Sequence, residues 1–449
     1  MNATQSPNAM SKRRILVIHQ NFPGQFRHVL TALQGRADVE VIGIGREGAP
    51  GMPGVQWLRY KTHRSAAKET HPYCRSFENA VLHGQAVCRL LMQLKDQGFV
   101  PDVVLAHPGW GETLYLREVF PQTKLIHLCE WFYDANGPDM GFDPEFPAAL
   151  DDRLRVSTWR AHHLLALEQC DVAIAPTQWQ KSQFPATYQP KIQVLHEGIA
   201  TDVLGSDPQA QLTLPNGQVL TAGDPVVTYV ARNLEPYRGF HVFMRCLPAL
   251  LAAHPHCQVL IVGGDEVSYG RPPKNAKSWR EALLREVNID TSRETGRVHF
   301  LGKLSHAHYR RVLQISAVHV YLTYPFVLSW SLLEALASGC AVVASDTAPV
   351  REVIQHGENG LLVDFFDGAR LLDAVGKVLN DPSGLQAMRR AAVESVKKRF
   401  AQRLGTAGYW GVLDVNTSRA VSEPISDALQ VGGMLTAKGK PVSPSVSSG

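Results

Sequence analysis

Short apolar runs rich in β-branched residues recur along the chain, and stretches with helical periodicity separate them. The candidate strands of the first half lie at residues 15–19, 39–44, 103–107, 124–128, 172–176 and 192–195. Helical periodicity is clearest at residues 76–96 and 150–170. Because strands that alternate with helices form a parallel sheet with helices on both faces, the pattern predicts a doubly wound α/β domain.

The alternation stops between residues 201 and 225 and then resumes. In that interval Asn216-Gly217 separates two short apolar runs, which predicts a small hairpin in a connection between domains. The second set of candidate strands lies at residues 226–231, 258–262, 298–301, 318–322, 341–344 and 360–363. We therefore expect two Rossmann-like α/β domains, at residues 12–203 and 204–400, then a return segment at 401–415 and a disordered tail at 416–449.

Composition and charge limit the expected location of the protein and its expected partners. The seven cysteines include no C-x-x-C pair, which is typical of a reduced, cytoplasmic protein. No signal peptide is recognisable, and no uninterrupted apolar run approaches the roughly 18–20 residues that span a bilayer. We therefore expect any membrane contact to be peripheral, at the inner face of the cytoplasmic membrane. The net charge of +4 is too small to indicate a nucleic-acid partner, and we expect none.

Two arginines follow the first candidate strand of the second half. Open parallel sheets bind ligands at the carboxyl ends of their strands, so Arg232 falls at a ligand-binding edge. Arg238 and Gly239 fall where the next helix begins, and guanidinium groups with free helix N–H groups suit a phosphate or diphosphate. The alternative is that both arginines are solvated loop residues. The position at a strand end favours the anion site.

The segment 323–340 is expected to contain a strand end, a loop and a helix that ends at Gly339. Ser331 and Glu334 have the spacing of a capping box, in which the glutamate bonds to the backbone at the helix start. Glu334 is equally a candidate for ligand binding. Glu334 can cap the helix and bind a ligand at the same time only if one of its carboxylate oxygens stays free.

The order of these motifs resembles glycosyltransferase family 4 (group 1), bacterial retaining transferases of the GT-B fold that use nucleotide-sugar donors. Each motif is weak alone, but their order and spacing are specific, and the similarity extends over about residues 14–400. The matching segments are 19–27, 109–112, 138–142, 226–239, 258–264, 298–302, 332–339, 342–346 and 357–363. The resemblance implies a fold of two doubly wound Rossmann-like domains facing across a cleft, with the acceptor on the N-terminal side and the donor on the C-terminal side.

For the donor side, the resemblance implies that Arg232 and Arg238 neutralise the donor diphosphate and act in catalysis. Arg238 replaces the usual lysine, and Glu334 matches the second glutamate of the Glu-x7-Glu motif, which binds the ribose. The first glutamate, which contacts the donor sugar, is replaced by Phe326, so the sugar is held differently or not at all. The remaining expected donor-binding residues are Val327, Leu328 and Ser329 in the loop, Gly302 and Lys303 near the base, and Gly24.

In the first domain the family has a glycine pair and a histidine, and this chain departs from both. Only Gly24 represents the pair, and Glu130 lies nearest to the usual histidine position. We expect Glu130 to contact acceptor or sugar as a catalytic residue. His107 and Trp110 are expected to line the acceptor side, with packing as the alternative for Trp110. His127 is a further acceptor-side candidate, although a core histidine within a strand is the favoured interpretation.

The implied function is transfer of a sugar, with retention of configuration, from a nucleotide diphosphate donor to an acceptor hydroxyl in cell-surface polysaccharide or glycoconjugate synthesis. The expected partners are the nucleotide-sugar and a saccharide or lipid-linked saccharide acceptor. No cofactor and no metal ion are expected, because the histidine pairs 254/256 and 306/308 lack carboxylate or thiolate partners at ligand spacing. The alternatives are a catalytically silent GT-B subunit that binds nucleotide or glycan, a nucleotide-sugar epimerase, and a phosphorylase.

Overall fold

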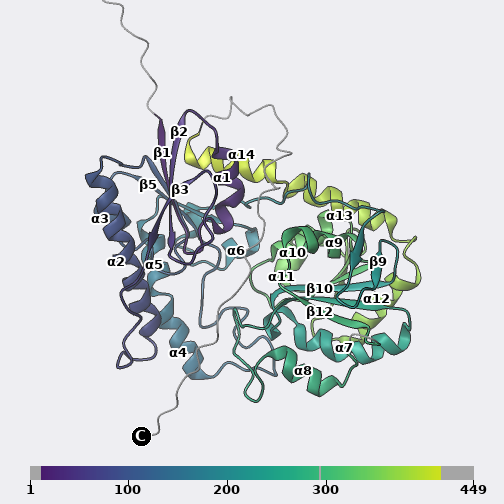
Figure 1. Cartoon of the computed structure of the whole chain (residues 1–449). Helices are drawn as coiled ribbons and strands as arrows, with labels where there is room; N and C mark the ends of the chain where they lie inside the picture. Colours follow the sequence, from purple (N-terminus) through teal and green to yellow (C-terminus); the bar gives the residue numbers. More distant parts are fainter. Residues whose placement is uncertain (1–11, 293–294, 416–449) are drawn as a thin grey trace, which may run out of the picture. The chain divides into compact units, whose positions relative to one another are not determined.

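The computed structural model describes residues 12–292 and 295–415 (Figure 1). The tail predicted to be disordered, 416–449, lies outside the described residues. The described residues contain two parallel sheets with helices on their faces, and both sheets belong to one compact unit that ends at Val415. The predicted α/β class with two Rossmann-like sheets is confirmed.

The first sheet has seven parallel strands in the order β3-β2-β1-β4-β5-β6-β7. Their bounds are β1 Arg13–Ile18, β2 Val39–Arg46, β3 Gln56–Tyr60, β4 Val103–Ala106, β5 Lys124–Leu128, β6 Val172–Ala175 and β7 Ile192–Val194. Six of them match the predicted runs to within about two residues. Strand β3 was missed because it is an edge strand in which Arg59 and Gln56 interrupt the apolar pattern and face solvent.

Helices cover both faces of this sheet. Buried apolar residues of α2 (Arg75–Asp96), α3 (Leu116–Val119) and α5 (Ala161–Gln169) pack against one face of the sheet. Helix α1 (Arg27–Leu33) lies on the other side. The stretch at residues 150–170, predicted as a single helical segment, is two helices, because α4 (Leu150–Trp159) ends before α5 begins and Arg160 separates them. Helix α6 is Gln178–Ser182.

The second sheet has six parallel strands in the order β12-β11-β10-β13-β14-β15. Their bounds are β10 Val226–Asn233, β11 Gln258–Gly264, β12 Val298–Gly302, β13 Val318–Tyr321, β14 Ala341–Ser345 and β15 Leu361–Val363. Before them, β8 (Gln211–Thr213) and β9 (Val219–Thr221) pair antiparallel around Asn216-Gly217, so the predicted hairpin is confirmed.

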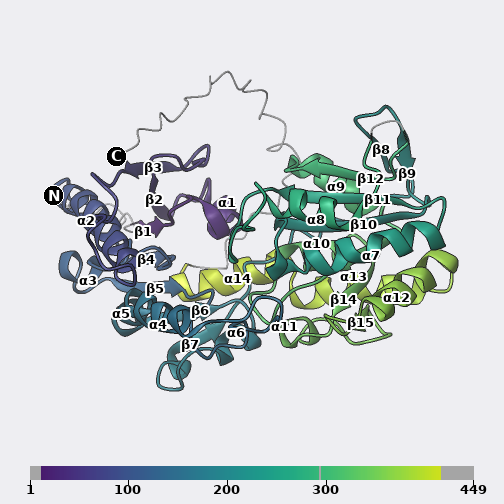
Figure 2. The ribbon, with the colours of Figure 1, turned by 90° about the horizontal axis from the view of Figure 1, so that it is seen from below.

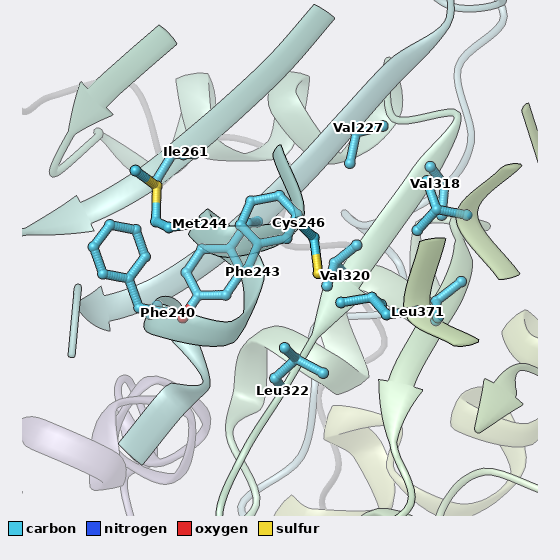
Figure 3. Packing of buried hydrophobic residues seen from close by; sticks show 14 of the residues in the cluster. Val227, Phe240, Phe243, Met244, Cys246, Ile261, Val318, Val320, Leu322 and Leu371 are labelled. Atoms are coloured by element: carbon cyan, nitrogen blue, oxygen red, sulfur yellow. The ribbon is translucent and has the colours of Figure 1, made fainter. Parts of the chain in front are cut away.

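Two helix layers enclose the second sheet as well. Figure 3 shows the first of them, where Phe240 and Phe243 of α7 (Phe240–Ala253) pack with Leu371 of α12 (Gly368–Asn380) against strand residues such as Val320. Helix α8 (Trp279–Val287) adds to this layer. The other face carries α9 (His306–Gln314), α10 (Trp330–Ala337), α11 (Ala348–Arg351) and α13 (Gln386–Arg399). Alternate residues of each strand therefore point into separate apolar layers.

The last helix, α14 (Gln402–Leu413), follows the second sheet in sequence and packs with the first. Figures 1 and 2 both draw it beside elements of the first sheet. The chain crosses back at Ile199, whose N–H donates to the carbonyl of Phe400 at 2.7 Å and whose carbonyl accepts from Gln402 at 2.8 Å. Tyr409 and Leu413 are then fully buried among residues of β1 and α1.

Each sheet reverses its strand order once, at β1/β4 in the first and at β10/β13 in the second. Such switch points leave a crevice outside the carboxyl ends of the strands, where ligands of open α/β sheets bind. The residues that follow these four strands are therefore the first place to look for a site. Within the described ranges, no helix is both long and apolar enough to cross a membrane.

Candidate functional site

A cavity of about 340 Å³ opens at the carboxyl ends of β10, β11 and β12. Its lining residues are Ala231, Arg232, Val262, Gly263, Lys303, Leu304 and Tyr309. Arg232 is exposed and, among the described residues, its guanidinium has no hydrogen-bond or ion-pair partner. A free guanidinium at the switch point of a parallel sheet is suited to bind an anion.

Lys303 also lines this cavity, and its contact with the base stays a prediction. Its ammonium pairs with the carboxylate of Glu266 at 2.9 Å, and both side chains are exposed. The bond from Lys303 lowers the pKa of Glu266, and the charge of Arg232 adds to that effect. Gly302 ends β12 with a φ of +66° and does not line the cavity itself.

Glu334 is connected to the same cavity through Tyr309. The hydroxyl of Tyr309, on α9, donates to Oε2 of Glu334 at 2.7 Å, while Oε1 has no partner among the described residues. Burial raises the pKa of the Glu334 carboxyl above its ordinary value. The capping-box interpretation is wrong: α10 begins one residue after Ser329, whose hydroxyl accepts from the N–H of Ser331 at 3.2 Å. The spare oxygen of Glu334 is free for a ligand.

Arg238 is buried, with 8% of its surface exposed, and it organises the loop that follows β13. Its Nη1 donates to the hydroxyl of Thr323 at 2.7 Å and to the carbonyl of Val327 at 3.1 Å, and it lies 3.4 Å from the hydroxyl of Tyr321. The guanidinium carbon lies 5.5 Å from the ring centre of Tyr269. Arg238 thus holds a positive charge beside the loop and fixes the conformation of the loop.

The loop itself offers fewer donors than expected. The N–H of Ser329 is occupied, because it donates to the hydroxyl of Tyr321 at 3.0 Å. Within the described part of the chain, the N–H groups of Val327 and Leu328 have no acceptor. Both residues are buried and lie just before Ser329, which caps α10. These two amides, with the start of α10, form a donor site next to Arg238.

Phe326 lies in an aromatic cluster and is 2% exposed. Its ring centre is 4.7 Å from that of Trp131 and 4.9 Å from that of Tyr269. Trp179 donates from Nε1 to the Phe326 carbonyl at 3.3 Å. Trp131 follows β5, Trp179 lies on α6 and Tyr269 follows β11, so the side chain at position 326 packs with apolar surface from both halves of the chain.

The first sheet contributes a second cluster at the carboxyl ends of β1, β4 and β5. His19 is buried, and its Nδ1 accepts from the N–H of Asn21 at 2.9 Å, so Nε2 carries the proton and donates to Gln25 at 2.6 Å. Burial and the neighbouring His107 lower the pKa of His19 to about 3. Gly24 has to be glycine here, because a Cβ would lie 2.4 Å from the His19 ring.

His107, Trp110 and Glu130 lie together at this edge of the first sheet, and their contacts with an acceptor stay a prediction. The ring of Trp110 stacks on that of His107 with the centres 4.7 Å apart. Nδ1 of His107 accepts from Gly109, so the Nε2 proton faces Oε2 of Glu130 at 3.6 Å. Burial alone raises the pKa of Glu130, but the interactions with His107, Gln25 and His19 together outweigh burial, and the pKa is lowered. Glu130, whose side chain is 37% exposed, is therefore an anion at the edge of the site.

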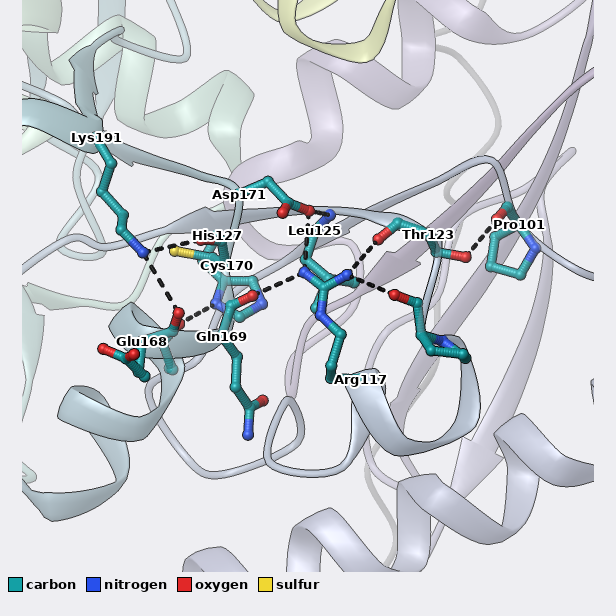
Figure 4. Close-up of polar contacts among 12 residues, drawn as sticks. Pro101, Arg117, Thr123, Leu125, His127, Glu168, Gln169, Cys170, Asp171 and Lys191 are labelled. Carbon is teal, nitrogen blue, oxygen red and sulfur yellow. Dashed lines mark hydrogen bonds and ion pairs between the residues drawn. The ribbon is translucent and has the colours of Figure 1, made fainter.

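His127 lies apart from this cluster. It is fully buried within β5, its Nδ1 is 3.1 Å from the carbonyl of Ala166, and burial lowers its pKa to about 4. Figure 4 shows it in a network in which Arg117 and Lys191 donate to backbone carbonyls. Arg117 also donates to the carboxylate of Asp171. This geometry favours the core interpretation of His127 over an acceptor-side role.

Several residues of the site were not predicted from the sequence. Tyr309, Tyr321 and Tyr269 reach it from separate segments, and nothing in their local sequence marks them. His19 follows β1 directly and Glu197 follows β7 by three residues, so the strand-end criterion that selected Arg232 and Glu130 also applies to them.

One group of described residues has potential metal ligands close together: Asp143, Glu145 and His241. Glu145 accepts from Arg245 at 2.6 and 2.9 Å, and Asp143 accepts from Tyr324 at 2.8 Å and pairs with His241 at 2.9 Å. These contacts join the segment after β5 to α7, so the group serves to attach one half of the chain to the other.

Comparison with known proteins agrees with this geometry. Residues 37–204 match the family model "Glycosyl transferase family 4 group", and residues 224–381 match "Glycosyl transferases group 1". D-inositol 3-phosphate glycosyltransferase from Nocardioides sp. is 26% identical over 51% of this chain and 51% of its own length. The chain thus spans about half the length of the curated relatives it matches.

Two solved structures have the same fold. Sucrose-phosphate synthase from Thermosynechococcus elongatus is 19% identical, with a TM-score of 0.67 over 90% of this chain and 98% of that one. Anabaena HepE in complex with UDP and glucose is 14% identical, with a TM-score of 0.64 over 90% of this chain and all of that one. The chain therefore belongs to the glycosyltransferases of family 4 and group 1, with the GT-B fold.

Proposed function

We propose that this protein is a retaining glycosyltransferase that moves a sugar from a nucleotide diphosphate donor to an acceptor hydroxyl. The observation that carries the proposal is the cavity at the carboxyl ends of β10 to β12. Arg232, whose guanidinium is free, and Tyr309 both line it, and Tyr309 donates to Glu334, which keeps one carboxylate oxygen unoccupied. A base with its ribose fits this cavity, and the diphosphate then extends towards Arg238 and the start of α10.

The reaction depends on stabilisation of the charge that develops in the transition state. As the glycosidic bond breaks, negative charge develops on the diphosphate and positive charge on the sugar. Arg232 and the donor site formed by the amides of Val327 and Leu328 stabilise the leaving group. Arg238 is already fixed by its bonds to Thr323 and Val327, so little reorganisation is needed when the charge appears. The leaving phosphate then assists deprotonation of the acceptor, without a metal ion.

The acceptor binds on the side of the first sheet. Trp110 offers an aromatic face against which a sugar ring can pack, and Glu130 is an anion that can accept a hydrogen bond from a hydroxyl. A saccharide or a lipid-linked saccharide fits these contacts. The proposed location is cytoplasmic, with peripheral contact to the membrane when the acceptor is lipid-linked.

The first test is calorimetric titration with UDP, GDP and ADP. We expect one base to be preferred, and both Arg232→Ala and Glu334→Ala to weaken its binding at least tenfold. Arg89→Ala is the matched control, because Arg89 is an exposed arginine on α2. Failure of all three nucleotides to bind would overturn the proposed donor site.

Three further measurements separate the activity from its alternatives. Hydrolysis of the bound nucleotide-sugar distinguishes a transferase from a silent subunit, while conversion of the free donor or a requirement for phosphate would indicate an epimerase or a phosphorylase. The anomeric configuration of the product tests retention. Activity unchanged by EDTA is expected for a metal-independent transferase, and a loss restored by Mg²⁺ would contradict that part of the proposal.

A further inference from the structure

Tyr269 lies between β11 and α8, in a short segment that a buried carboxylate holds in place. Glu235 follows β10 by two residues and is 1% exposed. Its carboxylate accepts hydrogen bonds from the backbone N–H groups of Ser268, Tyr269 and Gly270, at 3.0, 3.1 and 2.9 Å. Because hydrogen bonds to an ionised acceptor are strong, the backbone of Tyr269 is fixed before any ligand binds.

The side chain of Tyr269 lies against Arg238 and Phe326. Its ring centre is 5.5 Å from the guanidinium carbon of Arg238, and a hydrogen bond joins the two side chains. The ring of Phe326 meets that of Tyr269 at 61°, with the centres 4.9 Å apart. Tyr269 is nevertheless partly exposed, so a ligand can reach its surface.

The hydrogen bond to Arg238 determines how the Tyr269 hydroxyl can act on a ligand. A guanidinium group only donates, so the phenolic oxygen accepts in this bond and keeps its own proton free to donate. Within residues 12–292 and 295–415, no acceptor takes that proton. The hydroxyl of Tyr269 is therefore an oriented neutral donor.

The other polar aromatic side chains around Phe326 are occupied, enclosed or farther away. The hydroxyl of Tyr237 donates to a carboxylate at 3.0 Å. Trp131 is 5% exposed, and its Nε1 is buried. The ring centre of Tyr133 is 6.4 Å from that of Phe326, compared with 4.9 Å for Tyr269. Tyr269 is thus the best-placed donor of this cluster for a ligand.

Tyr269 also lies where the diphosphate site approaches the first half of the chain. Arg238 and the loop amides before α10 form the site proposed for the diphosphate. The ring of Phe326, next to Tyr269, packs on Trp131 as well, and Trp131 follows Glu130 of the proposed acceptor side. The sugar that is transferred has to lie between the diphosphate and the acceptor, so it comes close to Tyr269.

We propose that Tyr269 binds the donor sugar, and that its hydroxyl donates a hydrogen bond to a sugar hydroxyl. The inference rests on the proposed function. Phe326 offers the sugar only apolar surface, so the polar contact comes from the tyrosine beside it. A neutral hydroxyl makes this contact without placing a negative charge next to the diphosphate, where a carboxylate would be repelled.

The contact is tested by calorimetry on Tyr269→Phe, which keeps the ring that packs on Phe326 and removes only the hydroxyl. The probes are the nucleoside diphosphate that binds and its nucleotide-sugar, drawn from UDP-glucose, GDP-mannose and ADP-glucose. We expect the affinity for the nucleotide-sugar to fall about three- to tenfold, as for the loss of one neutral hydrogen bond. The affinity for the diphosphate should change less than about twofold, because the sugar contact is absent there. Tyr188→Phe, at another partly exposed tyrosine, is the matched control and should bind both probes like wild type.

Monodeoxy analogues of the same nucleotide-sugar separate a direct contact from a change in the loop. We expect one analogue to bind wild type more weakly than the parent nucleotide-sugar does. The same analogue should bind Tyr269→Phe as well as the parent does, because the contact is already missing from that variant. If every analogue loses affinity in the same ratio for wild type and Tyr269→Phe, the inference is overturned.

The outcomes separate this inference from the proposed function. Equal nucleotide-sugar affinity of wild type and Tyr269→Phe, with the diphosphate bound normally, would overturn only the inference. Equal losses for the diphosphate and the nucleotide-sugar would assign the hydroxyl to the diphosphate and would overturn it as well. If wild type binds no nucleoside diphosphate, the proposed function fails and the assignment of Tyr269 fails with it.

Discussion

Replacement of Arg232 by alanine should separate ligand binding from folding. The guanidinium is exposed and has no partner among the described residues, so its loss should change the free energy of unfolding by no more than about 0.5 kcal/mol. A hydrogen bond from a charged group to a diphosphate contributes about 1.5–3 kcal/mol, which corresponds to roughly a 10- to 150-fold rise in Kd. Turnover should fall by at least about tenfold, because the leaving group loses the same contact.

The assay is calorimetric titration of wild type and Arg232→Ala with the preferred nucleoside diphosphate, alongside urea unfolding of both. Arg232→Lys should recover part of the affinity, since it keeps the charge but not the fork geometry. Arg89→Ala should match wild type in both measurements. A Kd for Arg232→Ala within threefold of wild type would refute the contact assigned between Arg232 and the diphosphate, and a large loss of stability would refute the description of Arg232 as a free side chain.

Two further substitutions have distinct expected signatures. Arg238→Ala should weaken nucleotide binding and also lower the free energy of unfolding by about 1.5–3 kcal/mol in urea titrations, because Thr323 and the carbonyl of Val327 lose a buried charged donor. Glu197→Gln should become progressively more stable than wild type as pH rises from 4.5 to 8, by up to about 5 kcal/mol, and the difference should stay constant above pH 8. The sign follows because burial raises the pKa of Glu197 to about 8, so the folded protein holds a proton on Glu197 that the unfolded chain has released. A difference in the free energy of unfolding between the two proteins that does not change with pH would contradict the raised pKa.

Local sequence was sufficient to predict most strands and the residues that end them. Arg232 and Glu130 were found because a strand's carboxyl end is recognisable in the sequence, and the order of strands and helices then assigns that end to a binding edge. Strand β3 was not recognised, because it is an edge strand that faces solvent and its apolar pattern is interrupted.

Local patterns could not assign the partners of these residues. Ser331 and Glu334 have capping-box spacing, but the carboxylate bonds to Tyr309 of a different helix, and Ser329 caps α10 instead. In the same way, Arg238 appeared to be free for a ligand, whereas the fold surrounds one of its nitrogens with acceptors that are 85 and 89 residues away in sequence.

The sequence by itself determined the α/β class, the two sets of parallel strands and the edge where chemistry is expected, because periodicity and strand ends are properties of neighbouring residues. Only the tertiary structure decided which of those residues are free, which are paired and which are buried. It left Arg232 open to a cavity, placed Phe326 among aromatic rings, and brought α14 against Glu197. Burial and pairing depend on contacts between segments hundreds of residues apart, and these contacts set the charge that each carboxyl group carries.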